Sequence, residues 1–162
     1  MDLENEEFRL FAENAQRTQL KYLVIGGFAM YLNGLSRNTE DVDIWLEPTQ
    51  ENGGRFIETL IGMGYDESEI EVVRQLDFTE PQVFGLNNYI DILTYVHRKF
   101  DFNESYARSR SFQNDHGHTI YFLHLNDLRE QKVVAHRMQD LRDIIMIDEF
   151  IAQQKQFGES EQ

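Results

Sequence analysis

The segment 22–46 constrains the fold more than any other part of the sequence. It opens with four apolar residues, Tyr22–Ile25, which have the length and composition of a buried β-strand. Gly26 and Gly27 follow, and a short helix is expected over 28–32. Glycines between a strand and a helix let the backbone approach a ligand closely, and the N–H groups at a helix start favour anions. The segment therefore predicts a strand–turn–helix unit suited to a phosphate group.

The second half of this segment carries two acidic residues. Residues 41–46 alternate acid and apolar side chains before ending on Trp45 and Leu46. Positions two apart in a strand share a face, so Asp41 and Asp43 are expected to point the same way. Adjacent carboxylates repel, and burial without a partner would raise at least one pKa. A divalent cation between them removes this conflict, and such hard oxygen ligands suit Mg²⁺.

A third acidic residue, Asp91, stands within the otherwise apolar and uncharged segment 89–95. An isolated buried carboxylate costs on the order of several kcal/mol unless it is paired. Asp91 is therefore expected to lie beside Asp41 and Asp43, which makes a site of three carboxylates.

Taken in order, these pieces resemble the nucleotidyltransferase superfamily related to DNA polymerase beta. The shared pattern is Ile25-Gly-Gly, a spacer of 13 residues, Asp-x-Asp at 41–43, and a third acid between apolar residues at 90–92. The chain is most similar to small bacterial members, the AbiEii-like toxins and minimal nucleotidyltransferases. Those often carry Arg-x-Thr-or-Ser-x-Asp-x-Asp, which here spans 37–43. The resemblance covers about the first 95 residues.

A second part of the resemblance lies near the C-terminus. Lys132, Arg137, Asp140 and Asp143 follow an order that small members of this group often show. By that resemblance Lys132 would face the triphosphate, and the other three would brace two helices. The alternative is that all four are solvated helix charges paired at i,i+4 spacing.

The resemblance implies a metal-dependent nucleotidyltransferase, an enzyme that moves a nucleoside monophosphate from a nucleoside triphosphate to a hydroxyl acceptor. Asp41, Asp43 and Asp91 would be both the catalytic residues and the metal ligands, with two Mg²⁺ ions expected. Asp91 would also take the proton of the acceptor. The implied nucleotide-binding residues are Gly26, Gly27, Arg37, Thr39 and Lys132.

The acceptor is left open by the sequence. The resemblance offers a small hydroxyl compound, a tRNA 3′ end or a protein hydroxyl, and we favour a protein partner, as in a toxin–antitoxin pair. The alternative function is a non-catalytic, antitoxin-like protein that keeps the fold and binds a partner. The three acids argue against that alternative, because a binding module has no need of converging carboxylates.

Composition limits the class of protein. The 29 acidic and 15 basic residues give a net charge of −14, which disfavours loose binding of long nucleic acid, because that binding neutralises phosphates. The sequence contains no cysteine, so disulfides and cysteine zinc sites are excluded. The acidic start, MDLENEEF, has no signal-peptide pattern, and no apolar run approaches the length of a membrane helix. We therefore expect a cytoplasmic protein without a membrane partner.

Basic residues are expected to gather in two regions that make a locally positive cleft for a triphosphate. One region combines residues 97–99 with Arg108 and Arg110. The other combines Arg129, Lys132, Arg137 and Arg142.

The whole pattern predicts an α/β (α+β) fold in which a small, mixed and mostly antiparallel sheet is flanked by helices, with further helices at the C-terminus. We expect one domain, with a nucleotidyltransferase core at 1–125 and a helical extension at 126–162 packed on it. Further helices are expected over 3–17, 49–62, 101–109, 128–138 and 141–154, and a helix is favoured over a strand within 65–76. Hairpins are expected to join 78–86 to 89–95 and 111–113 to 118–125. Residues 153–162 are expected to fray.

His116 and His118 have the spacing of a possible zinc pair. A polar turn between two strands needs no metal, however, and no third ligand stands at a suitable spacing. We therefore expect an ordinary turn there.

Overall fold

The computed structural model describes residues 3–160. Its helices are α1 (Glu6–Thr18), α2 (Gly26–Leu32), α3 (Gln50–Met63), α4 (Glu67–Arg74), α5 (Phe102–Ala107), α6 (Leu125–Ala135) and α7 (Met138–Ser160). Its strands are β1 (Tyr22–Ile25), β2 (Val42–Leu46), β3 (Val83–Gly85), β4 (Ile90–Leu93), β5 (Arg110–Gln113) and β6 (Thr119–Phe122).

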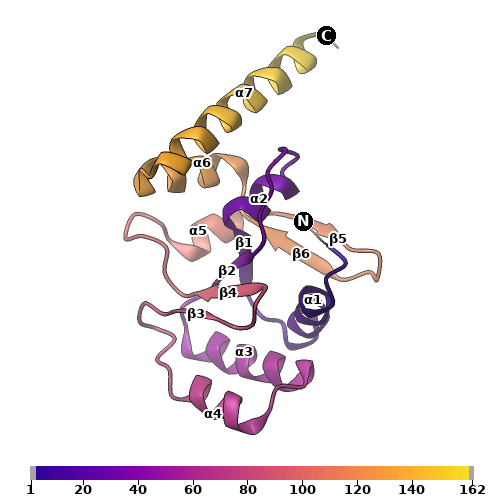
Figure 1. Ribbon diagram of the computed structural model, residues 1–162, viewed down its shortest axis with the longest axis vertical. Coiled ribbons are helices and arrows are strands. Elements are labelled where there is room, and N and C mark those ends of the chain that lie inside the picture. The colour runs from indigo at the N-terminus through magenta and orange to yellow at the C-terminus, as the bar shows by residue number, and fades with distance from the viewer. Residues whose placement is uncertain (1–2, 161–162) are drawn as a thin grey trace.

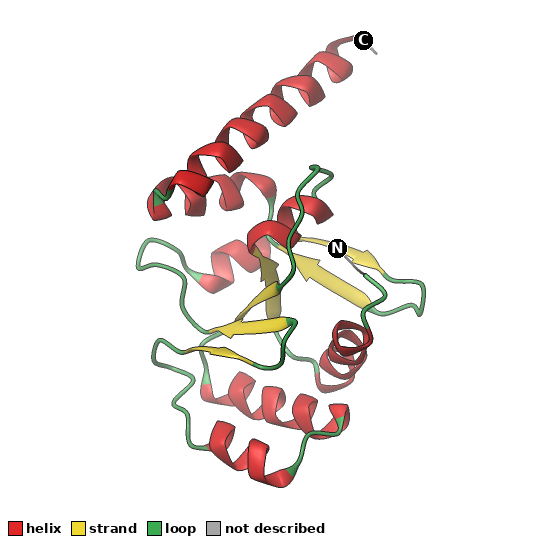
Figure 2. Cartoon of the chain, viewed as in Figure 1, coloured by secondary structure: helices red, strands yellow, loops and turns green. Residues whose placement is uncertain are grey.

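The six strands form one mixed sheet in the order β3-β4-β2-β1-β6-β5. The β1–β2, β3–β4 and β5–β6 pairs are antiparallel, whereas β1–β6 and β2–β4 are parallel. Figure 2 shows this sheet at the centre with helices around it. The predicted α/β class, with C-terminal helices, is confirmed.

Both faces of the sheet are covered by aromatic contacts to helices. On one face Phe11 of α1 packs edge-on against Tyr22, with ring centroids 5.1 Å apart, and Phe56 of α3 lies over the edge strand β3. On the other face Phe102 of α5 packs against Trp45 at 5.2 Å. Aromatic side chains bury more apolar area per residue than other side chains do, so these contacts place the central strands inside the hydrophobic core.

Local signals set most helix boundaries. The hydroxyl of Thr49 accepts a hydrogen bond from the Asn52 N–H at 3.1 Å, so Thr49 caps α3. Asp66 N–H bonds the carboxylate of Glu69 at the start of α4, and the preferred helix within 65–76 is confirmed. The first helix begins later than expected, at Glu6, because the side chain of Asn5 caps it.

Both predicted hairpins are present, and asparagine side chains shape their turns. Asn87 Oδ1 accepts a hydrogen bond from the Ile90 N–H at 2.8 Å and closes the β3–β4 turn. In the β5–β6 turn, Asn114 Oδ1 accepts from the N–H groups of His116 and His118 at 3.0 and 2.9 Å. Asparagine thus explains the turn that holds the two histidines.

The boundaries of the last two helices differ from expectation. α6 begins at Leu125, where the ring of His124 caps it, rather than after Asn126. α7 begins at Met138 and continues to Ser160, so the tail expected to fray is helical as far as it is described. Its glutamines, glutamates and lysine are good helix formers, and no proline interrupts them. In Figure 1 the yellow end of α7 extends beyond the rest of the molecule.

The C-terminal helices pack on the rest of the chain through a few apolar side chains. Leu128 of α6 and Ile147 of α7 belong to the same buried cluster as the strands. A Cβ added to Gly34, after α2, would lie 3.3 Å from the ring of Phe150, so α7 closely contacts the loop that follows α2. Across residues 3–160, no helix combines the length and the apolar character needed to cross a bilayer.

Candidate active site

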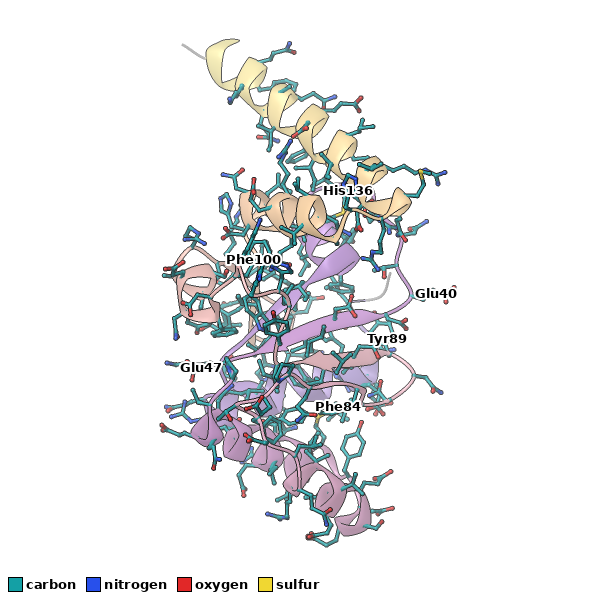
Figure 3. All side chains as sticks on the ribbon, turned by 90° about the vertical axis from the view of Figure 1, so that its left-hand side faces the viewer. Glu40, Glu47, Phe84, Tyr89, Phe100 and His136 are labelled. Atoms are coloured by element: carbon teal, nitrogen blue, oxygen red, sulfur yellow. The ribbon has the colours of Figure 1, made fainter. Side chains whose placement is uncertain are left out.

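Asp43 of β2 and Asp91 of β4 are direct partners across two parallel strands. Residues paired in register project from the same face of a sheet, so the two carboxylates lie side by side. Figure 3 shows Glu40 and Tyr89, which precede these strands, on one side of the molecule, and Glu47, which follows β2, on the other. The acids thus lie at the end of the central strands where β1 stops and α2 begins.

Gly26 lies directly against Asp43. Ile25 pairs with Asp43 across β1 and β2, and the next residue, Gly26, has φ +67°. A Cβ at Gly26 would lie 2.6 Å from Asp43 Oδ2. Glycine is therefore required for the backbone conformation and for the space beside the carboxylate.

Asp41 and Thr39 lie in the loop before β2. Because β2 begins at Val42, strand alternation does not set the direction of Asp41, contrary to expectation. The Thr39 hydroxyl donates a hydrogen bond to the Asp41 carbonyl at 3.1 Å. A Cβ at Gly27 would lie 3.2 Å from Thr39 Cβ, so the second glycine makes room for this threonine.

The carboxylates perturb one another. Burial, together with the nearby charges of Asp91 and Asp41, raises the pKa of Asp43 to about 6, although Lys132 and Arg137 oppose the rise. Burial also raises the pKa of Asp91, again with a contribution from Asp41. Like charges interact strongly only at short range, so the three predicted acids lie close to one another. Lys132 of α6 and Arg137, which follows α6, are near enough to lower the pKa of Asp43.

Lys132 is buried and bonded to two aspartates of α7. It is 8% exposed, whereas Asp140 and Asp143 are 0% and 2% exposed. Its Nζ donates to Asp143 Oδ2 at 2.8 Å and lies 3.4 Å from Asp140 Oδ1. The i,i+4 alternative is therefore wrong for Lys132, but neither does its amine stand free toward a triphosphate, because two acids hold it.

Arg37 and Arg137 complete this cluster. Arg37 Nε lies 3.1 Å from Asp143 Oδ1, an ion pair without the alignment of a hydrogen bond. Arg137 Nε donates to Asp140 Oδ2 at 2.8 Å. Burial raises the pKa of Asp140, but the bonds from Arg137 and the charge of Lys132 outweigh it, and the net shift is downward. The sequence did not predict that Arg37 would link the loop after α2 to α7.

The two expected basic regions are partly neutralised. Arg108 forms a two-bond pair with Asp127, at 2.9 and 3.0 Å. Arg129 forms a similar pair with Asp148, at 2.6 and 3.1 Å. A continuous positive cleft across these residues is therefore absent from the described part of the chain.

The carboxylates of Asp41, Asp43 and Asp91 are candidate ligands for a divalent cation. Their oxygen atoms are the hard donors that Mg²⁺ prefers, and Gly26 leaves space beside Asp43 Oδ2. In the present arrangement no three His, Cys, Asp or Glu side chains of residues 3–160 converge as a metal-holding group. The donor set fits Mg²⁺ chemically, and the side chains would have to draw together to hold it.

Two hollows adjoin the sheet ends. One of about 650 Å³ is lined by Tyr31 and residues 34–38, which include Arg37. Another of about 570 Å³ is lined by residues such as Lys21, Tyr22 and Glu47, at the opposite end of β1 and β2. The first hollow is the one that shares a residue with the candidate site.

No family model matches the chain, and no curated protein matches it. The site is therefore interpreted from its own geometry.

Proposed function

We propose that the protein is a metal-dependent nucleotidyltransferase that moves a nucleoside monophosphate from a nucleoside triphosphate to a hydroxyl acceptor. The observation that carries this proposal is the register of Asp43 opposite Asp91, with Gly26 against Asp43 Oδ2. Buried strands hold the two repelling carboxylates side by side, and the backbone of Gly26 lies close against one of them. This arrangement suits a divalent cation, which can in turn bind the negatively charged phosphate groups of a nucleotide.

Asp43, Asp91 and, from the preceding loop, Asp41 would hold Mg²⁺. The ion would supply charge neutralisation of phosphate oxygens and a lower pKa for the acceptor hydroxyl. We expect the carboxylates to approach one another only when a cation offsets their repulsion.

The residues of the site would then have distinct roles in the transfer reaction. Gly26 and Gly27 let the backbone approach the phosphates. Asp91, whose pKa is raised by burial and by Asp41, is suited to accept the proton of the acceptor hydroxyl. Lys132 and Arg37 would bind phosphate oxygens by exchanging some of their contact with Asp143, and the Thr39 hydroxyl would add a hydrogen bond.

The direct test incubates the protein with Mg²⁺, each of four labelled nucleoside triphosphates, and a lysate or purified candidate acceptors. The wild-type chain is expected to transfer label to an acceptor, and Asp43→Asn to lose at least about a hundredfold of that rate, as a lost charge-stabilising group does. Asp115→Asn, the same change in an exposed turn, is the matched control. Transfer by Asp43→Asn at the rate of the control would overturn the proposal. We favour a protein as the labelled acceptor.

A non-catalytic, partner-binding role is the second candidate. It is favoured by one observation: Lys132 and Arg37, which transfer would need, are both engaged by Asp143. Titration calorimetry with ATP, with and without Mg²⁺, separates the two. Mg²⁺-dependent binding that Asp43→Asn abolishes supports the enzyme, and the absence of ATP binding under both conditions supports the binding protein.

A further inference from the structure

A separate pocket of about 480 Å³ lies among α2, β5, α6 and α7. Arg110, His124 and Lys155 line it, together with the amides of Asn33 and Asn126 and the ring of Phe150. We call it the basic pocket. None of the described residues that line it is acidic, although the chain as a whole carries a net charge of −14. A volume of this size is in the range of small-ligand sites.

The lysines and arginines of this chain divide into two groups of similar size, those that pair with described acids and those that do not, and the two cations of the basic pocket belong to the second group. Ion pairs with described acids engage eight basic residues: Lys21, Arg37, Arg55, Arg74, Arg108, Arg129, Lys132 and Arg137. Arg110 and Lys155 form no ion pair with any described side chain. They come from positions 45 apart in the sequence and line one pocket, in a fold where α7 packs on α6.

The arginine is oriented by a buried amide. Asn33 is 6% exposed, and its Nδ2 donates to the carbonyls of Ala29 and Leu123 at 2.8 and 3.0 Å. These bonds turn Asn33 Oδ1 toward the Arg110 guanidinium, whose Nη1 lies 3.5 Å away. The guanidinium also lies 5.9 Å from the centroid of the Phe122 ring, a cation–π contact. Arg110 is an exposed residue, and these two contacts direct its guanidinium toward the pocket while leaving most of its N–H donors available.

His124 adds a neutral donor. Its Nδ1 accepts the Asn126 N–H at 3.1 Å, which assigns the ring proton to Nε2. The pocket therefore combines a guanidinium, an ammonium and an imidazole N–H, with no carboxylate among its described lining residues. Guanidinium and ammonium donors are the groups that bind phosphate oxygens in proteins.

We propose that the basic pocket binds a phosphate group. Arg110 pairs with Phe122, and Phe122 pairs with Val24, at the ends of their strands. The basic pocket therefore lies at the same end of the strands as the acids. Strands lie about 4.8 Å apart, so β6 and β5 stand roughly 10 and 14 Å from β2. A phosphate on the acceptor substrate is the natural occupant; that role rests on the proposed function, whereas phosphate binding itself does not.

The test is a ¹H–¹⁵N NMR titration of the full chain with inorganic phosphate and, separately, adenosine 5′-monophosphate, in EDTA without Mg²⁺. Saturable shift changes are expected at the amides of Arg110, Asn126 and Lys155. The double variant Arg110→Gln, Lys155→Gln is expected to weaken binding at least about tenfold, since two charge-assisted contacts are lost. Tighter binding of the nucleotide would identify a nucleotide phosphate as the ligand, and equal binding would identify phosphate alone; both support the pocket.

The matched control is Arg98→Gln, Lys99→Gln. It removes one arginine and one lysine that form no ion pair with described side chains, from exposed positions between β4 and α5. Binding by this control is expected to stay within about twofold of wild type. Equal weakening in both double variants, or shift changes confined to Gly26 and Gly27, would overturn the proposal. Because the titration does not use Asp43, Asp43→Asn should bind phosphate normally even where transfer is lost.

Discussion

Asp43 faces Asp91 directly across the parallel β2–β4 pair, and the apolar residues on either side of each acid are fully buried. Val42, Ile44 and Ile92 are each 0% exposed. The backbone positions of the two acids cannot separate without disturbing this frame, because its interior is close-packed. The chain therefore maintains a repulsion between like charges at one edge of its sheet, which is a cost to stability that a bound cation would relieve.

Asp43→Asn should stabilise the protein at neutral pH. The pKa of Asp43 is about 6 in the folded chain against about 3.9 when unfolded. Folding therefore favours the protonated acid, and stability falls as the pH rises from about 4 through 6. Replacing the charge by an amide should raise the free energy of unfolding at pH 7.5 by about 1–3 kcal/mol, measured by urea denaturation.

The pH dependence supplies the control for that prediction. At pH 4 the wild type is already protonated at Asp43, so the gain from Asp43→Asn should shrink to nearly zero. Asp115→Asn, at an exposed turn, should be neutral within about 0.5 kcal/mol at both values. A gain that does not depend on pH would show that repulsion at Asp43 is not its source.

Mg²⁺ binding should weaken in acid, because protons and the cation compete for Asp43. With a pKa of about 6, one competing proton lowers the apparent affinity roughly tenfold at pH 5 relative to pH 7.5. Titration calorimetry with Mg²⁺ and ATP at the two values measures this. An affinity that is constant over this range would remove Asp43 from the set of metal ligands.

Gly26→Ala should damage both the fold and the site. The new Cβ would meet Asp43 Oδ2 at 2.6 Å in a backbone with φ +67°, so we expect a loss of about 1–3 kcal/mol and of nucleotide binding. Gly54→Ala is the matched comparison, because Gly54 lies within α3 and its added Cβ would meet nothing within 4 Å. That change should stabilise the chain by about 0.5–1 kcal/mol. Thermal unfolding and ATP titration measure both effects.

Lys132→Met should be strongly destabilising. It leaves Asp140 and Asp143 buried without the amine that bonds them, and breaking a buried pair from one side costs about 3–5 kcal/mol. Arg37 and Arg137 remain beside Asp143 and Asp140 in this variant, so the loss should lie toward the lower end of that range. Lys155→Met, on the exposed end of α7, should change the unfolding free energy by less than about 0.5 kcal/mol. Similar losses for the two lysines would mean that the buried pair contributes little.

Short-range rules account for what could be predicted. An apolar run before two glycines predicts β1, alternation of acid and apolar residues predicts β2, and the Asn87–Asn88 turn predicts the β3–β4 hairpin; each depends on neighbours in the chain. That Asp43 and Asp91 must meet also followed from the sequence, because a lone acid in an apolar strand requires a partner.

By itself the sequence therefore determined the strands at the centre of the sheet and the acids they carry. Only the tertiary structure decided that Lys132 and Arg37 share Asp143, and that Arg110 and Lys155 meet in one pocket. Those contacts join residues far apart in the chain, and they depend on how α6 and α7 dock on the sheet edge. A charged side chain on a helix has the same local pattern whether it is solvated or buried in a pair, so no rule confined to neighbouring residues distinguishes the two.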